Sequence, residues 1–394
     1  MGRRSSTALA ACAVLFGLAA CGGGTSTSAT PPADIGLTAE AALGEKIFHD
    51  SSLSASGRQS CATCHVSANG HSPDNALAAQ FGGPVGDQQG TRKTPGIRYL
   101  ATNTPFFFAA DGTPTGGFFW DGRSRTFAEQ AAEPFINPFE MANADKAALV
   151  ARVAAAPYAA DFKALFGPDV FADIDGAYLR ISLAVQQYER EDVEFNAYSS
   201  KYDAFLRGTV TLGDQEMRGL ALYNSPTKGN CAGCHPSARG ADGSPPRFTD
   251  FTYDNLGLPR NPELQRNADP TYFDLGLCQR ADLAARTDLC GVFKVPSLRN
   301  VALRRAYFHN GRFKTLKDAL TFYVQRDTNP EKFYPLDASG MPLKFNDLPP
   351  QYRANVNVTE VPYNRRPGDG PALSDAEIDD VIAFPRTLSD DYTP

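Results

Sequence analysis

Two short cysteine–histidine motifs are the residues whose types and spacing most clearly indicate a chemistry. Residues 61–65 read C-A-T-C-H and residues 231–235 read C-A-G-C-H. Two thiols at this spacing can form thioethers with both vinyl groups of one porphyrin, and the adjacent histidine can then bind the iron. A redox dithiol or half of a zinc site would use the same residue types, but the repeated motif favours two covalently bound haem c groups. The expected attachment and iron-binding residues are Cys61, Cys64 and His65, and Cys231, Cys234 and His235.

The amino-terminal residues predict export from the cytoplasm. Two arginines precede residues 8–20, which are nearly all apolar or small, and this run is too short to span a membrane. The run ends in L-A-A-C at Cys21, which resembles the lipoprotein box of bacteria, so residues 1–21 predict a lipoprotein signal peptide with Cys21 as the lipidation site. Cleavage after a small residue, with an incidental cysteine, is the alternative. Residues 22–36 are rich in Gly, Ser, Thr and Pro and predict a flexible tether, so we expect a periplasmic protein with a lipid anchor in a membrane.

The remaining composition is that of a globular protein. The 394 residues are 42% hydrophobic and 21% charged, and they allow two domains of ordinary size. The net charge is −6 and no Lys/Arg-rich block occurs, so we expect no nucleic-acid partner. Of the eight cysteines, Cys12 and Cys21 fall in the signal, which leaves Cys278 and Cys290 as the last pair. In an oxidising compartment we expect these two to form a disulfide rather than to remain free thiols.

An internal duplication surrounds the two motifs. A glycine followed four residues later by an aromatic residue precedes each one, at 44–48 and at 219–223, and both stretches predict a short amphipathic helix. Helical spacing of apolar residues also occurs at 147–155 and 178–193, and Ser374 begins a capping-box pattern.

The fold prediction follows from these helices and from the scarcity of strand patterns. Long loops rich in Gly, Pro and Asn lie at 82–117, 236–275 and 327–372. We therefore predict a mainly α protein of two cytochrome c-like haem domains in one chain, with long loops. The amino-terminal domain would cover residues 37–205 and carry the first haem, and the carboxy-terminal domain would cover residues 206–394 and carry the second haem.

Several further motifs carry a resemblance to a known family. In chain order they read F-F-W-D-G-R at 118–123, E-Q-A at 129–131, N-P-F-E-M at 137–141, F-K-V-P-S-L-R-N-V-A at 293–302 and Y-F-H-N-G at 307–311. Together they resemble the bacterial dihaem cytochrome c peroxidase family, and within it the MauG-like branch, from about residue 38 to about residue 390.

The resemblance implies a set of catalytic residues. Trp120, the only tryptophan, corresponds to the residue that relays oxidising equivalents between the haems, although an ordinary core tryptophan would look the same. Glu140 corresponds to the distal carboxylate that moves a proton during peroxide cleavage, with a surface glutamate at a helix cap as the alternative. Gln130 and Pro134 fall at the other distal-pocket positions, whereas Glu133 lies off the motif and is expected at the surface.

The resemblance also implies that the two irons differ. Many members close the peroxidatic iron with a histidine on a later loop, but His71 follows His65 too closely for that role and is expected to be structural or to contact a propionate. The first haem should therefore have an open distal site. At the second haem, Tyr323 stands at the position of the sixth ligand, and a phenolate would stabilise high oxidation states of iron. A core tyrosine is the alternative, with Met341 as a substitute ligand, and His309 is expected to contact the haem pocket.

Two departures from the family pattern bear on calcium and on packing. The family binds a calcium ion between the haems, but its asparagine aligns with about Tyr99 and its carbonyl segment with 304–306, so calcium is not carried over and Arg304 could replace its charge. Pro385, where a leucine is usual, should kink or end the terminal helix.

Three functions from different classes follow from these expectations. The first is a peroxidase that reduces hydrogen peroxide at the first haem, shares oxidising equivalents with the second through Trp120, and takes electrons from a small cytochrome c or cupredoxin. The second is a MauG-like oxidase that uses peroxide to modify a tryptophan or similar residue on a partner protein. The third is a non-enzymatic electron-transfer or redox-sensing cytochrome, which Glu140 and an open iron site disfavour.

Overall fold

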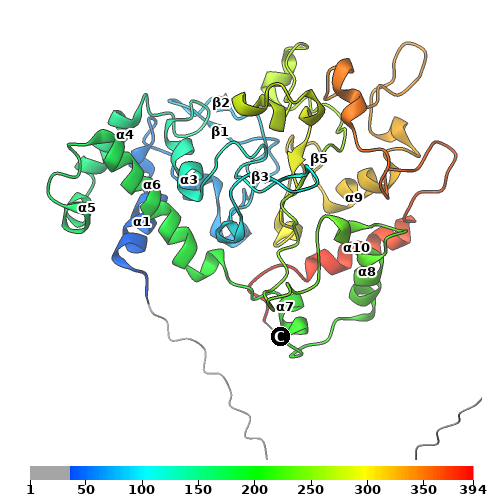
Figure 1. Ribbon diagram of the computed structural model, residues 1–394, viewed down its shortest axis with the longest axis horizontal. Helices are drawn as coiled ribbons and strands as arrows, with labels where there is room; N and C mark the ends of the chain where they lie inside the picture. The colour runs from blue at the N-terminus through cyan, green and yellow to red at the C-terminus, as the bar shows by residue number, and fades with distance from the viewer. Residues whose placement is uncertain (1–35, 394) are drawn as a thin grey trace, which may run out of the picture. The chain divides into compact units, whose positions relative to one another are not determined.

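A computed structural model describes residues 36–393 of the chain (Figure 1). The predicted signal peptide 1–21, its lipidation site Cys21 and all but the last residue of the predicted tether 22–36 lie outside the described residues. From Leu37 onward the chain forms one compact unit. Within the described part, no helix is long and apolar enough to cross a membrane.

The first half of this unit is built on a crossing of its first and last helices. Its helices are α1 Ala39–His49, α2 Cys61–Cys64, α3 Phe127–Ile136, α4 Lys146–Ala155, α5 Ala159–Phe166 and α6 Ile174–Glu191. α4 and α6 confirm the helices expected from periodicity. α1 lies against α6 at Gly44, where a Cβ atom would collide with the carbonyl of Ala184. Phe48, four residues later, is fully buried and packs its ring 5.4 Å from that of Tyr188.

The second half repeats this arrangement. Its helices are α7 Lys201–Leu206, α8 Asp214–Asn224, α9 Leu316–Gln325 and α10 Asp375–Arg386. α8 lies beside α10 (Figure 1), and they meet at Gly219, where a Cβ atom would collide with the carbonyl of Asp380. Tyr223 is the buried aromatic residue here, with its ring 4.9 Å from that of Phe384. The glycine–aromatic pattern seen in the sequence is thus the signature of one helix crossing used twice.

Helix ends follow the capping signals. The Ser374 hydroxyl accepts from the backbone N–H of Glu377, and the Glu377 carboxylate accepts from that of Ser374, which makes the predicted capping box of α10. α10 ends at Arg386, one residue after Pro385, as expected for a residue that lacks a backbone N–H.

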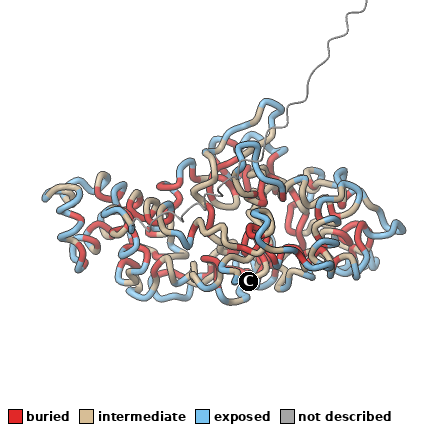
Figure 2. The backbone as a smooth tube through the Cα atoms, turned by 90° about the horizontal axis from the view of Figure 1, so that it is seen from below, coloured by how far each residue is buried: buried red, intermediate tan, exposed pale blue. Residues whose placement is uncertain are grey.

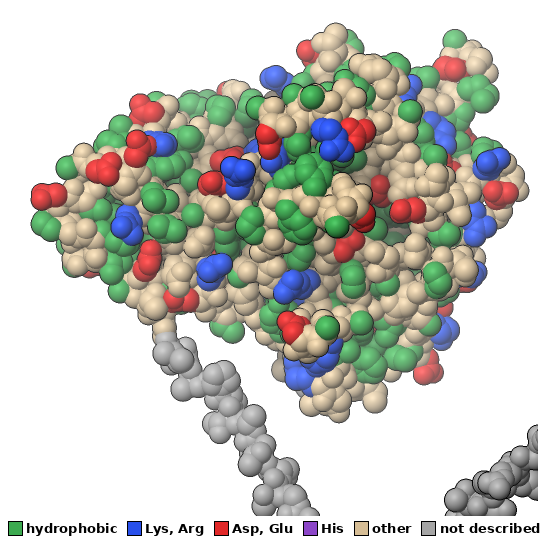
Figure 3. All heavy atoms as spheres, viewed as in Figure 1, with side chains coloured by type: hydrophobic (Ala, Val, Ile, Leu, Met, Phe, Trp, Pro, Cys, Tyr) green, Lys and Arg blue, Asp and Glu red, His purple; other side chains and the backbone are tan. Residues whose placement is uncertain are grey.

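Strands contribute little to the described residues. They form three antiparallel pairs of two-residue strands: β1 Phe81–Gly82 with β2 Gln88–Gln89, β3 Phe107–Phe108 with β4 Pro114–Thr115, and β5 Tyr253–Asp254 with β6 Phe293–Lys294. The mainly α class is therefore confirmed. Buried stretches run through the interior of the unit (Figure 2), and charged side chains of both signs are scattered over the face shown in Figure 3.

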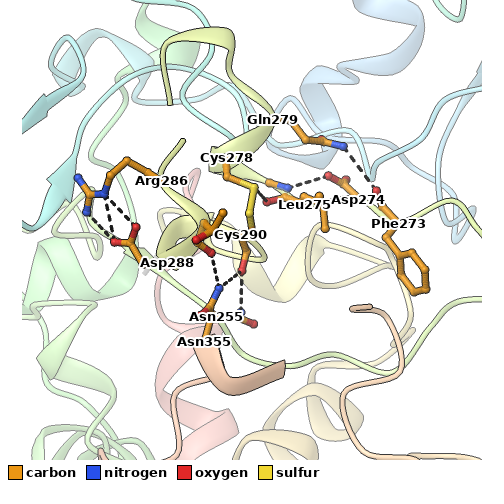
Figure 4. Close-up of a disulfide and its surroundings, with 12 residues drawn as sticks. Asn255, Phe273, Asp274, Leu275, Cys278, Gln279, Arg286, Asp288, Cys290 and Asn355 are labelled. Carbon is orange, nitrogen blue, oxygen red and sulfur yellow. Dashed lines mark hydrogen bonds and ion pairs between the residues drawn. A yellow bond between two sulfur atoms is a disulfide. The ribbon is translucent and has the colours of Figure 1, made fainter. Parts of the chain in front are cut away.

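A disulfide cross-links the loop that precedes β6. Cys278 and Cys290 are joined, with an S–S distance of 2.13 Å (Figure 4). The Cys290 carbonyl accepts hydrogen bonds from the side-chain amides of Asn355 (3.1 Å) and Asn255 (3.4 Å). The cross-link and these bonds hold the loop in place immediately before β6, whose residues border the second cavity described below.

A buried ion pair links α7 to the 293–302 segment. Both Asp203 carboxylate oxygens accept from the Arg299 guanidinium at 2.9 Å, and the two side chains are 2% and 1% exposed.

Asp203→Asn should lower the free energy of unfolding by about 3–5 kcal/mol, because it leaves a buried guanidinium without its counter-charge. Urea unfolding of the purified protein measures this loss. Asp288→Asn, in the exposed pair with Arg286, is the control and should change stability far less. Equal losses for both variants would contradict the prediction.

Candidate functional site

The first cavity is bordered by the first cysteine–histidine motif. Cys61 and Cys64 lie in the single turn of α2, and His65 follows it directly. His65 Nδ1 donates to the backbone carbonyl of His71 at 3.1 Å, which leaves Nε2 free to bind a metal. Burial lowers the pKa of His65 to about 4, so the ring is neutral, which is the form that binds iron.

His71 supports this ligand rather than acting as one. Its buried ring stacks on Phe195, with centroids 4.0 Å apart, and its Nε2 lies 3.2 Å from a carboxylate oxygen of Glu194. The structural role expected for His71 agrees with this position, because its carbonyl orients His65.

The second cavity repeats the arrangement. Cys231 lies in the 3-10 turn Cys231–Gly233, and Cys234 and His235 follow. His235 Nδ1 donates to the carbonyl of Phe248 at 2.8 Å, and burial lowers the pKa of His235. Each half therefore presents a neutral, oriented imidazole beside two thiols at the edge of a cavity.

The state of the thiols argues against a redox dithiol. Burial raises the pKa of Cys64 to about 11 and those of Cys231 and Cys234 to about 12, whereas reactive dithiols have lowered values. In addition, no group of three or more His, Cys, Asp or Glu side chains within residues 36–393 could hold a metal ion. Buried thiols next to an oriented histidine fit covalently attached haem better than either alternative.

The predicted distal residues line the first cavity. Gln130 and Pro134 lie on α3, and Glu140 lies in the turn that follows that helix. Burial raises the pKa of Glu140 to about 7, although the Arg123 charge opposes this. The Asn137 side-chain amide donates to Glu140 Oε1 at 3.0 Å. This is a carboxyl group that can both accept and release a proton near neutral pH.

Glu133 was expected at the surface, and this is wrong in part. Its carboxylate accepts from Arg123 Nε (2.8 Å) and from the Ser124 hydroxyl (2.6 Å), and it borders the first cavity. The side chain remains partly exposed because it lies at the rim.

Trp120 borders both cavities. Its indole N–H donates to the carbonyl of Lys93 at 2.8 Å, and its own carbonyl accepts from the backbone N–H of Lys294 in β6 at 2.8 Å. These two bonds hold the ring in the wall that the cavities share, at the place where an electron relay between them would have to lie.

Tyr323 and His309 both border the second cavity. Tyr323 lies on α9, and its hydroxyl makes no hydrogen bond with any described residue; burial raises its pKa. His309 stacks flat on Phe293, with centroids 3.4 Å apart, as a pocket contact would. Met341, the substitute ligand considered from sequence, is 64% exposed and borders neither cavity, whereas Tyr323 borders the second.

Sequence reasoning missed two buried charged residues of the site. Lys93 borders both cavities, and Glu189 of α6 borders the first. Burial raises the pKa of Glu189 to about 8, and its Oε2 has no hydrogen-bond partner among the described residues. The only sequence signal for Glu189 is its place four residues after Val185, on the buried face of α6.

Comparison with known proteins identifies the family. Residues 38–211 match the family described as di-haem cytochrome c peroxidase. Over 374 residues the chain is 35% identical to methylamine utilization protein MauG of Paracoccus denitrificans, covering 93% of this chain and 92% of that protein. It is 31% identical to cytochrome c551 peroxidase of Nitrosomonas europaea, covering 71% of each. The crystal structure of the diheme peroxidase BthA from Burkholderia thailandensis matches with a TM-score of 0.82 at 39% identity, covering 89% of this chain and 86% of that one.

These likenesses extend over both cavities and confirm the resemblance drawn from the motifs. The chain belongs to the di-haem cytochrome c peroxidase and MauG family, and it is a dihaem oxidoreductase of the peroxidase type.

Proposed function

We propose that this chain reduces hydrogen peroxide to water at the His65 site and draws electrons from the His235 site through Trp120. The observation that carries the proposal is the placement of Glu140 and Trp120 in one cavity with His65, while Trp120 also borders the cavity of His235. Haem c, held by the two cysteine–histidine motifs in domains 37–205 and 206–394, supplies the redox-active iron at each site.

Glu140 is the proton-transfer group in this proposal. Reduction of peroxide takes up two electrons and two protons and yields two waters. The Glu140 carboxylate accepts the proton of one peroxide oxygen and returns it to the other as the O–O bond breaks. A pKa of about 7 suits both steps, because neither protonation state is strongly favoured at neutral pH. Asn137 fixes Oε1, so Oε2 is the atom available for the proton.

The other residues of the two cavities have different roles in this proposal. Gln130 and Pro134 shape the peroxide side of the first cavity, together with Glu140. In the second cavity Tyr323 supplies an oxygen ligand that excludes peroxide, and His309 packs in the pocket wall. Trp120 passes an electron across the shared wall, and an external donor, a small cytochrome c or a cupredoxin, restores the electrons.

A MauG-like reaction is the second candidate. It is favoured by the 35% identity to MauG over 93% of this chain. In that case the electrons come from a side chain of a partner protein. That side chain is oxidised instead of an electron-carrier protein. Steady-state turnover of peroxide with a reduced cytochrome supports the first candidate. A protein product that is oxidised only in the presence of this chain and peroxide supports the second.

The pH dependence of the peroxide reaction tests Glu140. The reactive form is the carboxylate, so kcat/KM for peroxide should rise with pH through about 7. Glu140→Gln should lower the rate roughly 100- to 10,000-fold and abolish this acid limb. Stopped-flow mixing with peroxide measures both effects. Glu133→Gln, at the rim of the same cavity, is the matched control and should retain the limb. A Glu140→Gln enzyme with an unchanged pH profile would refute the role.

The spectrum of the second haem tests Tyr323. Tyr323→Met should give an absorption spectrum with methionine-ligated features and a higher reduction potential, because a thioether stabilises ferric iron less than a phenolate does. Tyr363→Phe is the control, since that ring lies 6.0 Å from the ring of Tyr323 without occupying its place. Unchanged spectra in Tyr323→Met would show that the tyrosine is not a ligand.

We also propose that the protein is a periplasmic lipoprotein, on the basis of the signal pattern that ends at Cys21. Cys21→Ala should move the protein from the membrane fraction to the soluble periplasmic fraction, because the anchoring thiol is lost. Fractionation followed by haem staining measures this. Membrane association that survives the substitution would mean that the anchor lies elsewhere.

A further inference from the structure

Two cations that border the cavities, Lys93 and Arg304, have no carboxylate partner among the described residues. Lys93 is 5% exposed, and its ammonium donates only to the carbonyl of Thr94, at 2.8 Å. The Arg304 guanidinium donates only to the carbonyls of Ser297 (2.7 Å) and Arg299 (3.3 Å). Among the described residues, no carboxylate lies within 4.0 Å of either charge.

Several other cations of this region are paired with carboxylates, whereas Lys294 of β6, like Lys93, donates only to a carbonyl, that of Gly117 at 2.7 Å. Arg92 bonds to Asp121 and Asp274, Arg98 to Asp390, and Arg299 to Asp203. Lys93 and Arg304 differ from these paired arginines because neither has an acidic partner. An unpaired charge away from water is unfavourable, so two such charges beside the cavities indicate an anion that binds there.

The two cations border the cavities that His65 and His235 also border. Lys93 borders both cavities, whereas Arg304 borders only the second. After burial, the Lys93 charge contributes to the lowered pKa of His65, and the Arg304 charge contributes to that of His235. Burial and the Arg304 charge together hold the pKa of Lys93 well below its ordinary value.

The ligand chemistry follows from this placement. Each haem carries two propionate carboxylates, and two haems bring four negative charges into the two cavities, of which Lys93 borders both and Arg304 the second. We infer that Lys93 and Arg304 bind the haem propionates, Lys93 those of both haems and Arg304 those of the second. The wall then needs no divalent metal ion to balance the carboxylates. This inference rests on the proposed dihaem function, but it concerns cofactor binding and not peroxide chemistry.

The reduction potentials of the holoprotein test the assignment. Removing a cation stabilises ferric haem, which carries one more positive charge than ferrous haem. At about pH 8, where the carboxylates are ionised, Lys93→Met should lower both potentials and Arg304→Met mainly that of the second haem. Lys93→Arg and Arg304→Lys should keep values close to the wild type. The surface variant Lys46→Met is the control and should leave both unchanged. Redox titration followed by absorption spectroscopy resolves the two haems.

The response of the reduction potentials to metal removal and to pH is the second measurement. Dialysis against EDTA should leave the potentials of the wild type unchanged. In Lys93→Met the potentials should become more dependent on pH between about 6 and 8, because a propionate without its cation takes up a proton on reduction. If the neutral variants fail to incorporate haem while the charge-conserving variants succeed, the need for the positive charge is supported.

Several outcomes would overturn the inference. Unchanged reduction potentials in both Lys93→Met and Arg304→Met would do so, even if these variants turn over peroxide normally. Potentials that fall with EDTA and recover with calcium would assign the charge to a metal ion. Loss of a nitrogen-ligated spectrum in Lys93→Met would make Lys93 an iron ligand, and loss of haem in the charge-conserving variants would indicate a packing role. A wild type inert to peroxide would refute the proposed function but leave these measurements valid.

Discussion

The cluster of Arg92 with Asp121 and Asp274 joins the two halves of the molecule beside Trp120. Arg92 bonds to Asp121 at 2.6 Å and to Asp274 at 2.6 and 2.7 Å, and so joins a segment of the first half to a loop of the second. Burial alone would raise the pKa of both carboxyl groups, but the Arg92 charge keeps them below their ordinary values. Because Asp121 directly follows Trp120, this cluster also fixes the residue that both cavities share. Loss of this cluster would leave buried charges without partners and would destabilise the wall between the sites.

The same local motif has different surroundings in the two halves. Each motif places two thiols and a neutral imidazole, oriented by a backbone carbonyl, at the edge of a cavity. The difference comes from the other elements that reach each cavity. α3 and the turn after it bring Pro134 and Glu140 to the first, and α9 brings Tyr323 to the second. A duplicated scaffold thus becomes asymmetric through residues distant from the duplicated motif.

Charge in the interior is divided between structure and cofactor binding. Arginines that join distant segments, such as Arg299 with Asp203, are paired with carboxylates of the chain itself. Lys93 also has a structural part, because its carbonyl receives the Trp120 indole N–H. Its ammonium, however, has only a carbonyl partner. The backbone of Lys93 therefore positions Trp120, while its ammonium has no acidic partner among the described residues.

The sequence by itself determined the features that depend on local spacing. These are the two attachment motifs, the helix crossings marked by Gly44 and Gly219, the capping box of α10 and the family, because each is encoded within a few consecutive residues. Only the tertiary structure decided that Glu140 has a raised pKa, that Trp120 borders both cavities, and that Glu133 pairs with Arg123. The burial of Lys93 and Glu189 likewise could not be predicted from the sequence, because an isolated charged residue is usually exposed to solvent. Burial and the absence of a partner depend on segments that meet only when the chain folds.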